Sequence, residues 1–146
     1  MTSEQKAPQA LTGLRILDFT QVLAGPFATQ QLAQIGALVI KIEQPVTGDM
    51  TRGLMSASSD GMSPSFLTCN LGKRSLAIDL KHPNAREVIF KLVSQADAVV
   101  ENFKPGTIER LGFGYEAIKA VKPDIVYASI SGFGQDGPRA TQPAFD

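Results

Sequence analysis

The stretch LRILDFTQVLAGPFATQQLAQIGALVIKI, residues 14–42, decides the fold. Residues 14–19 are a short apolar run with alternating character, which predicts a strand. Gly25-Pro26 then opens a helical stretch over 27–35 that Gly36 closes, because proline is tolerated in the first helical turn. Residues 38–42 are compact and β-branched and predict a second strand. Two strands joined by a crossover helix form a parallel pair.

The same alternation continues to the end of the chain and predicts an α/β class with a mostly parallel sheet and flanking helices. Residues 1–10 are expected to form a flexible polar tail. A long loop rich in Gly, Pro and Ser is expected over 44–64, and a glycine-rich turn over 132–138. Further strands are predicted over 75–80, 98–100 and 124–130, and further helices over 83–93, 105–111 and 115–121.

Composition excludes several classes of protein. The 146 residues carry 14 Lys plus Arg and 14 Asp plus Glu, so a nucleic-acid or polybasic membrane partner is not expected. With one cysteine, Cys69, and one histidine, His82, no disulfide and no Cys- or His-rich metal site is expected. No apolar run reaches the roughly 20 residues of a membrane span, and residues 1–10 do not resemble a secretory signal. We therefore expect a cytoplasmic protein.

Ligands of parallel α/β sheets bind beyond the carboxyl ends of the strands, so the segments that follow strands are the candidate site. Arg52, Lys73-Arg74 and Lys81 suit a small polyanionic ligand, although Arg52 could equally pair with Asp49 on the surface. Phe103 could stack on a purine, with Lys104 or Arg110 holding phosphate. Alternatively, Phe103 belongs to the core and Asn102 caps the next helix.

Other patterns carry less information. Residues 132–137 match G-x-G-x-x-G after a strand, but Pro138 and polar residues follow where an apolar helix should run, so an ordinary turn is favoured over a dinucleotide site. Cys69 is expected to be a small buried residue, and His82 a surface residue, rather than a catalytic pair. Asp18 is expected to end its strand.

Several ordered motifs together resemble the class III CoA-transferases. The run 17–30, LDFTQVLAGPFATQ, is similar to the opening signature of that family. The motifs VIKIE, GDMTRG, VENF and SISGFG recur in the family's order at 39–43, 48–53, 100–103 and 129–134, and Asn70, Lys73-Arg-Ser75, Pro105-Gly106 and Gly137-Pro138 complete the series.

The resemblance implies that residues 11–146 form the N-terminal part of a Rossmann-like large domain. In the family this domain binds coenzyme A (CoA) thioesters, which are substrates, and no separate cofactor is implied. It implies acyl-CoA and small carboxylates as partners and a homodimer for the full-length enzyme. By motif, the implied CoA contacts are Leu23, Ala24, Gln44, Ile78, Asp79, Leu80, Lys81, Asn102, Phe103, Lys104 and Arg110, with a further stretch near 143–146.

The resemblance also implies a mechanism. In the family an aspartate attacks the acyl-CoA carbonyl, and the resulting anhydride is converted to an aspartyl-CoA thioester that an acceptor carboxylate engages. That aspartate is expected beyond residue 146, so the chain by itself is expected to be an inactive N-terminal part of a longer enzyme.

Departures at three positions bear on the subfamily. Leu23 replaces a glutamine and Gln44 an arginine of formyl-CoA transferases. Phe145 stands where related racemases carry a histidine, and phenylalanine exchanges no proton, which favours a transferase. A racemase-like member and a non-catalytic CoA- or nucleotide-binding module stay open as alternatives.

Overall fold

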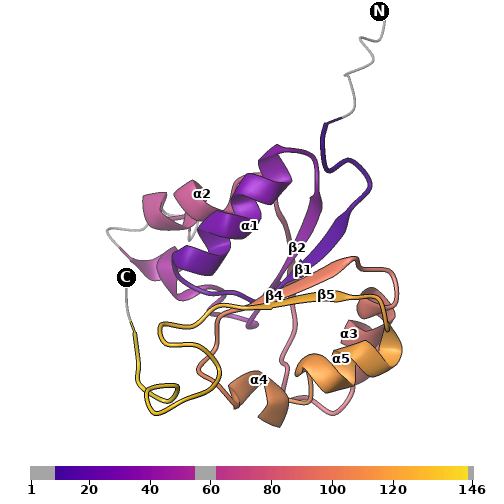
Figure 1. Cartoon of the computed structure of the whole chain (residues 1–146). Helices are drawn as coiled ribbons and strands as arrows, with labels where there is room; N and C mark the ends of the chain where they lie inside the picture. Colours follow the sequence, from indigo (N-terminus) through magenta and orange to yellow (C-terminus); the bar gives the residue numbers. More distant parts are fainter. Residues whose placement is uncertain (1–8, 55–61, 145–146) are drawn as a thin grey trace, which may run out of the picture.

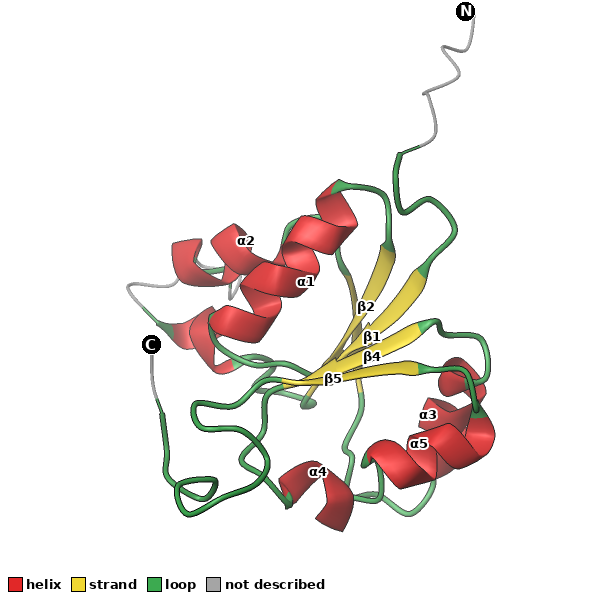
Figure 2. Ribbon diagram, viewed as in Figure 1, coloured by secondary structure: helices red, strands yellow, loops and turns green. Residues whose placement is uncertain are grey.

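The computed structural model describes residues 9–54 and 62–144. Five parallel strands form one sheet in the order β3-β2-β1-β4-β5, which confirms the predicted α/β class (Figures 1 and 2). The strands are β1 (Arg15–Asp18), β2 (Leu38–Glu43), β3 (Arg74–Ala77), β4 (Ala98–Glu101) and β5 (Val126–Ser129). The helices are α1 (Ala24–Gln34), η1 (Met50–Gly53, a 3₁₀ turn), α2 (Pro64–Asn70), α3 (Ala85–Val93), α4 (Thr107–Arg110) and α5 (Tyr115–Val121).

Helices cover both faces of the sheet. Figure 2 shows α1 and α2 on one side and α3, α4 and α5 on the other. Successive strand residues point to opposite faces, so Ile16 and Val39 pack towards α1, whereas Leu17 packs with Ile89 and Ile118 of α3 and α5. The larger core lies on the α3 and α5 side. These two cores hold the strand ends, and therefore the loops that follow them, in place.

Two short helices were not predicted from the sequence. The sequence pattern predicts a loop over 44–64 and no helix or strand between that loop and residue 75, yet residues 50–53 form η1 and residues 64–70 form α2. The reason is local capping: the Asp49 side chain accepts from Thr51 N, and the Ser63 side chain accepts from Phe66 N. Both helices are too short to show a helical apolar period. The part of the loop over 55–61, like tail residues 1–8, lies outside the described residues.

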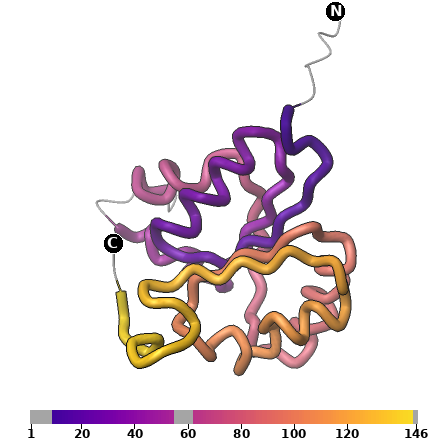
Figure 3. The backbone as a smooth tube through the Cα atoms, in the orientation of Figure 1, coloured from indigo at the N-terminus to yellow at the C-terminus, as the bar shows by residue number. Residues whose placement is uncertain are grey.

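The structure also bears on the predictions for Cys69, His82 and the glycine-rich segment after residue 131. Cys69 is buried and His82 is exposed, as predicted. Turns without a helix follow Gly132 as far as residue 144, which agrees with reading G-x-G-x-x-G as an ordinary turn; Figure 3 shows this segment looping at the end of the sheet where the strands finish. No helix among the described residues is long and apolar enough to span a bilayer.

Candidate functional site

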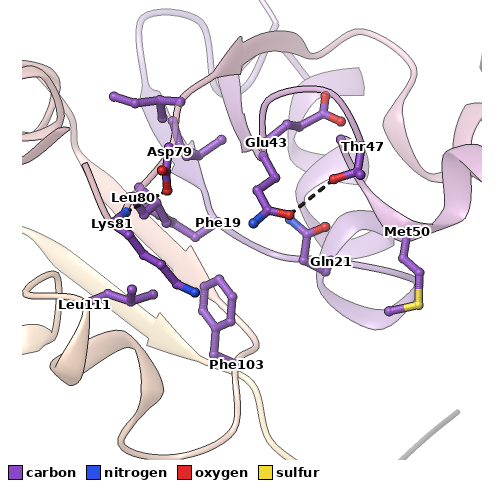
Figure 4. Close-up of a pocket in the computed structure, with 14 residues that line it drawn as sticks. Phe19, Gln21, Glu43, Thr47, Met50, Asp79, Leu80, Lys81, Phe103 and Leu111 are labelled. Atoms are coloured by element: carbon purple, nitrogen blue, oxygen red, sulfur yellow. Dashed lines mark hydrogen bonds between the residues drawn. The ribbon is translucent and has the colours of Figure 1, made fainter.

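A cavity of about 450 Å³ opens at the carboxyl edge of the sheet (Figure 4). The segments that follow β1, β2, β3 and β4 meet there because parallel strands all end at the same edge. The lining is largely apolar with a few polar groups, as in small-molecule sites. It consists of Phe19, Gln21, Ile42, Glu43, Gln44, Thr47, Gly48, Met50, Ile78, Asp79, Leu80, Lys81, Phe103 and Leu111.

The structure brings part of the implied CoA site together at this cavity. Gln44, Ile78, Asp79, Leu80, Lys81 and Phe103 line it. Leu23, Ala24, Asn102, Lys104 and Arg110 do not, and Arg110 instead donates to Thr107 Oγ1 at 2.9 Å. Leu23 is 46% exposed at the start of α1. The first group surrounds a ligand-sized space, whereas the second group is not part of its lining.

Lys81 and Phe103 mark one side of the cavity. Figure 4 shows the Lys81 side chain extending towards the ring of Phe103, with Leu111 beside them. The Lys81 main-chain N–H donates to Asp79 Oδ1 at 2.9 Å, which fixes the turn after β3. A cation and an aromatic ring on one wall are suited to a ligand that carries both phosphate and a flat ring.

The structure does not bear out the alternative given above for Arg52, a surface pair with Asp49. Arg52 does not pair with Asp49 but with Glu43, through Nε–Oε2 and Nη2–Oε1 contacts of 2.7 Å each. Ser75 Oγ donates to Glu43 Oε1 at 2.6 Å, and Asp49 N donates to Oε2 at 2.9 Å. Glu43 lies at the end of β2, where the sheet brings β3 and the 44–49 turn to it. Its charge is therefore compensated inside the cavity wall.

These contacts predict acid sensitivity. Burial by itself raises the pKa of Glu43, but hydrogen bonds from Arg52, Ser75 and Asp49 N outweigh it and lower the pKa from 4.5 to about 2. A depressed carboxyl pKa gives stability that is present above the unfolded value and lost as the pH falls through the folded value. We expect about 3 kcal/mol of unfolding free energy to disappear between pH 4.5 and pH 2.

Urea denaturation at neutral pH and in acid would measure this loss. Glu43→Gln should lack the loss of unfolding free energy that we assign to Glu43 in acid. Glu87→Gln, which changes an exposed carboxyl on α3, should still show that loss. An equal loss of stability in acid for Glu43→Gln and the unsubstituted protein would contradict the assignment.

Two buried lysine–aspartate pairs hold the turn between β1 and α1. Lys41 Nζ lies 2.8 Å from Asp49 Oδ2 and donates to the Thr20 carbonyl at 2.7 Å. Lys73 Nζ lies 2.8 Å from Asp18 Oδ2 and donates to the Pro26 carbonyl at 2.8 Å. Burial tends to raise the pKa of Asp49, but the charge and hydrogen bond of Lys41 and the bonds from Thr51 lower it overall.

Asp18 does more than end its strand. Its side chain accepts from Thr20 N at 2.9 Å, from Thr20 Oγ1 at 2.5 Å and from Thr29 Oγ1 at 2.6 Å, besides Lys73. The carboxylates of Asp18 and Asp49 are thus committed to structural contacts. Neither is placed as a free nucleophile.

Asn102 does not cap the following helix, whose N-cap is Gly106. Its side chain instead joins the end of β4 to the β1–α1 turn. Asn102 Oδ1 accepts from Gln21 N at 2.8 Å, and Asn102 Nδ2 donates to Gln21 O at 2.8 Å. The next residue, Phe103, faces the cavity.

The site and the sheet together define an α/β protein with a ligand cavity at the carboxyl ends of its strands. Residues 11–146 match the family described as CoA-transferase family III, and the chain belongs to that family. This confirms the resemblance carried by the ordered motifs.

Among similar proteins, an acyl-CoA transferase of Fusarium pseudograminearum is 44% identical over 100% of this chain and 34% of its own length. A formyl-CoA:oxalate CoA-transferase of Afipia carboxidovorans is 48% identical over 86% of this chain and 30% of its own length. A succinyl-CoA:glutarate CoA-transferase of Mus musculus is 42% identical over 99% of this chain and 33% of its own length. The chain thus spans about a third of the length of these relatives.

Solved structures agree with the fold. A CaiB/BaiF family protein from Brucella suis superposes with a TM-score of 0.89 at 40% identity, over 95% of this chain and 38% of the other. A hypothetical protein from Mycobacterium tuberculosis superposes with a TM-score of 0.86 at 39% identity, over 94% of this chain and 37% of the other.

Several lining residues were not singled out from the sequence. Gln21, Thr47 and Met50 lie on one wall, and Leu111 and Phe19 on others. Gln21 belongs to a segment that was predicted to carry chemistry, but nothing in its spacing distinguished it from Leu23 or Ala24. Leu111 enters from the loop after α4, which is not at a strand end and carried no signal.

Proposed function

We propose that this chain forms a CoA-binding part of an acyl-CoA:carboxylate CoA-transferase. The observation that carries the proposal is the cavity at the carboxyl edge, lined by Gln44, residues 78–81 and Phe103, which are among the CoA contacts that the family resemblance implies. The names of the relatives support transfer of CoA between acids. Lys81 is suited to bind a phosphate of CoA, and Phe103 to pack against its adenine.

The proposed chemistry uses a carboxylate nucleophile to form an anhydride and release the CoA thiolate, which then attacks the anhydride to form an enzyme-bound thioester. Such an anhydride needs positioning and exclusion of water. From the family resemblance, we propose that the attacking carboxylate is not among these 146 residues. We therefore assign CoA binding, rather than the attacking group, to this chain, and propose that it has no transferase activity by itself.

The direct test is CoA binding measured by isothermal titration calorimetry. We expect Lys81→Ala to weaken CoA binding about tenfold, because a charge-assisted contact contributes about 1.5–3 kcal/mol when shielded and less at an open rim. Lys91→Ala, at an exposed position on α3 that pairs with Glu87, is the matched control and should leave affinity unchanged. Absence of CoA binding by the unsubstituted chain, or equal affinity in both variants, would contradict the proposal.

A racemase-like activity is the second candidate, and it depends on exchange of the α-proton of an acyl-CoA. Incorporation of deuterium from heavy water without CoA transfer would favour it. CoA binding with neither reaction would favour a non-catalytic module. Phe145, which favours the transferase, lies outside the described residues.

We further propose that the full-length enzyme is a homodimer, as the family resemblance implies, and that it is cytoplasmic, as the composition of this chain leads us to expect. Sedimentation equilibrium of the full-length enzyme tests the oligomeric state.

A further inference from the structure

Three strands end in a buried acidic side chain at the carboxyl edge of the sheet. Asp18, Glu43 and Glu101 end β1, β2 and β4, and these residues are 0%, 3% and 2% exposed. Lys73 forms an ion pair with Asp18, and Arg52 forms one with Glu43. Among the described residues, no lysine or arginine forms an ion pair with Glu101. The charge of Glu101 is therefore buried without a paired cation.

Neutral donors hold the Glu101 side chain instead. Oε2 accepts from the main-chain N–H of Phe103 at 2.9 Å, and the carboxylate also accepts a hydrogen bond from Ser129, the residue opposite it on β5. The Glu101 carbonyl accepts from Ile130 N at 2.9 Å. Glu101 thus joins the ends of β4 and β5 to Phe103, which lines the cavity (Figure 4).

The surroundings of Glu101 add no buried positive charge. Side chains alternate along a strand, so Glu101 lies on the same face as Val99, the face that α3, α4 and α5 cover. The titratable groups that act on it from this face are acids, Glu109 on α4 and Tyr127 on β5. The chain after β1, beside β4, continues into apolar Phe19. The other charged side chains of residues 102–106, α3, α4 and α5 are exposed: Arg86, Glu87, Lys91, Lys104, Arg110, Glu116 and Lys119.

This environment disfavours the charged form of Glu101. Burial raises the pKa of Glu101 above the ordinary value of 4.5, Glu109 adds to the rise, and the hydrogen bonds from Ser129 and Phe103 N reduce it without cancelling it. A carboxyl with a raised folded pKa contributes most to stability below the unfolded value, and that contribution is lost as the pH rises through the folded value. The sign is opposite to that of Glu43, whose contribution is lost below pH 4.5.

The charge nevertheless strengthens the hydrogen bond to Phe103. Hydrogen bonds in which the acceptor is ionised are roughly twice as strong as those between neutral groups. When Glu101 gains a proton, Oε2 becomes a neutral acceptor and its bond to the Phe103 N–H weakens. One proton therefore has two opposite effects, because it removes a buried charge from the fold and loosens the main chain at the cavity wall.

We propose that Glu101 is a proton-dependent positioning residue of the cavity wall: its charged form holds the Phe103 main chain firmly at the end of β4, and its protonated form gives a more stable fold in which that hydrogen bond is weaker. The inference goes beyond the proposed function, because it concerns the wall itself and applies to any ligand of the cavity.

The Phe103 amide reports the state of Glu101 directly. In a pH titration of the ligand-free full chain by nuclear magnetic resonance, the Phe103 N–H signal should shift with a midpoint above pH 4.5. Below that midpoint its protection from hydrogen exchange, relative to an unstructured amide at the same pH, should fall about fivefold. Glu101→Gln keeps an acceptor for Phe103 N but does not titrate, so it should show no such transition. Glu87→Gln, at an exposed carboxyl on α3, is the matched control and should keep it.

Two further substitutions should move the midpoint of the Phe103 shift in opposite directions. Ser129→Ala removes a donor to the charged form of Glu101, so the midpoint should rise. Glu109→Gln removes a neighbouring negative charge, so the midpoint should fall towards pH 4.5. A Glu101 side chain that only packs, without titrating, would give neither change.

Urea denaturation provides the second readout. At neutral pH Glu101→Gln should unfold at a higher urea concentration than the unsubstituted chain, and below pH 4.5 this difference should disappear. A Phe103 signal without a transition above pH 4.5, or with the same transition in Glu101→Gln, would overturn the inference. Lower stability of Glu101→Gln at neutral pH would overturn it too. None of these measurements uses CoA, so a negative result leaves the proposed function standing.

Discussion

Lys41→Met is expected to lower the free energy of unfolding by about 3–5 kcal/mol, the usual cost of removing one partner of a buried ion pair. The Lys41 and Asp49 side chains are 1% and 0% exposed, so water cannot replace the lost ammonium. The substitution also leaves the Thr20 carbonyl without its donor. Methionine keeps most of the side-chain volume, so the loss should reflect charge and hydrogen bonding rather than a cavity.

Urea denaturation of the two proteins measures the difference. Lys91→Met is the matched control, because it removes the same group from an exposed pair with Glu87 on α3. Exposed pairs of this spacing contribute about 0.3–0.5 kcal/mol. A loss of similar size in both variants would show that the buried pair does not stabilise the fold as we infer.

Phe113→Ala is expected to cost about 3–5 kcal/mol, as other large-to-small substitutions of buried phenylalanine do. The Phe113 side chain is 1% exposed, and its ring centroid lies 6.1 Å from those of both Phe19 and Phe90. It therefore links α3 to the end of β1. Because Phe19 lines the cavity, removal of Phe113 takes away support from the cavity wall as well.

Thermal unfolding would show the effect as a fall in Tm of roughly 10–15 °C for a chain of this size. Phe27→Ala provides the comparison, since Phe27 is 51% exposed on α1 and should cost no more than about 0.5 kcal/mol. Equal losses at the two positions would contradict the core assignment.

Most of the fold followed from local patterns. The run 14–42 predicted a parallel βαβ unit, and the structure pairs β1 with β2 in that orientation. Strand ends were displaced by up to three residues: β3 covers 74–77 rather than 75–80, and β5 covers 126–129 rather than 124–130. The short helices were missed because they depend on capping by Asp49 and Ser63, which a periodic pattern does not record.

Part of the candidate site could be predicted from the sequence. The rule that ligands bind beyond strand ends predicted the position of the cavity, and Gln44, residues 78–81 and Phe103 line it. The same rule does not distinguish the residues that line the cavity from neighbouring residues that do not. Asn102 directly precedes Phe103, yet its side chain turns to Gln21.

The sequence by itself determined the α/β class, the family and the strand-end location of the site, because apolar periodicity and ordered motifs are properties of short segments. Only the tertiary structure decided which polar groups meet. Asp18 and Lys73 are 55 residues apart and Gln21 and Asn102 are 81 residues apart, and each pair exists because the sheet order brings their segments together. In the buried interior a charge or amide must find a partner nearby in space, so its partner is set by packing rather than by spacing along the chain.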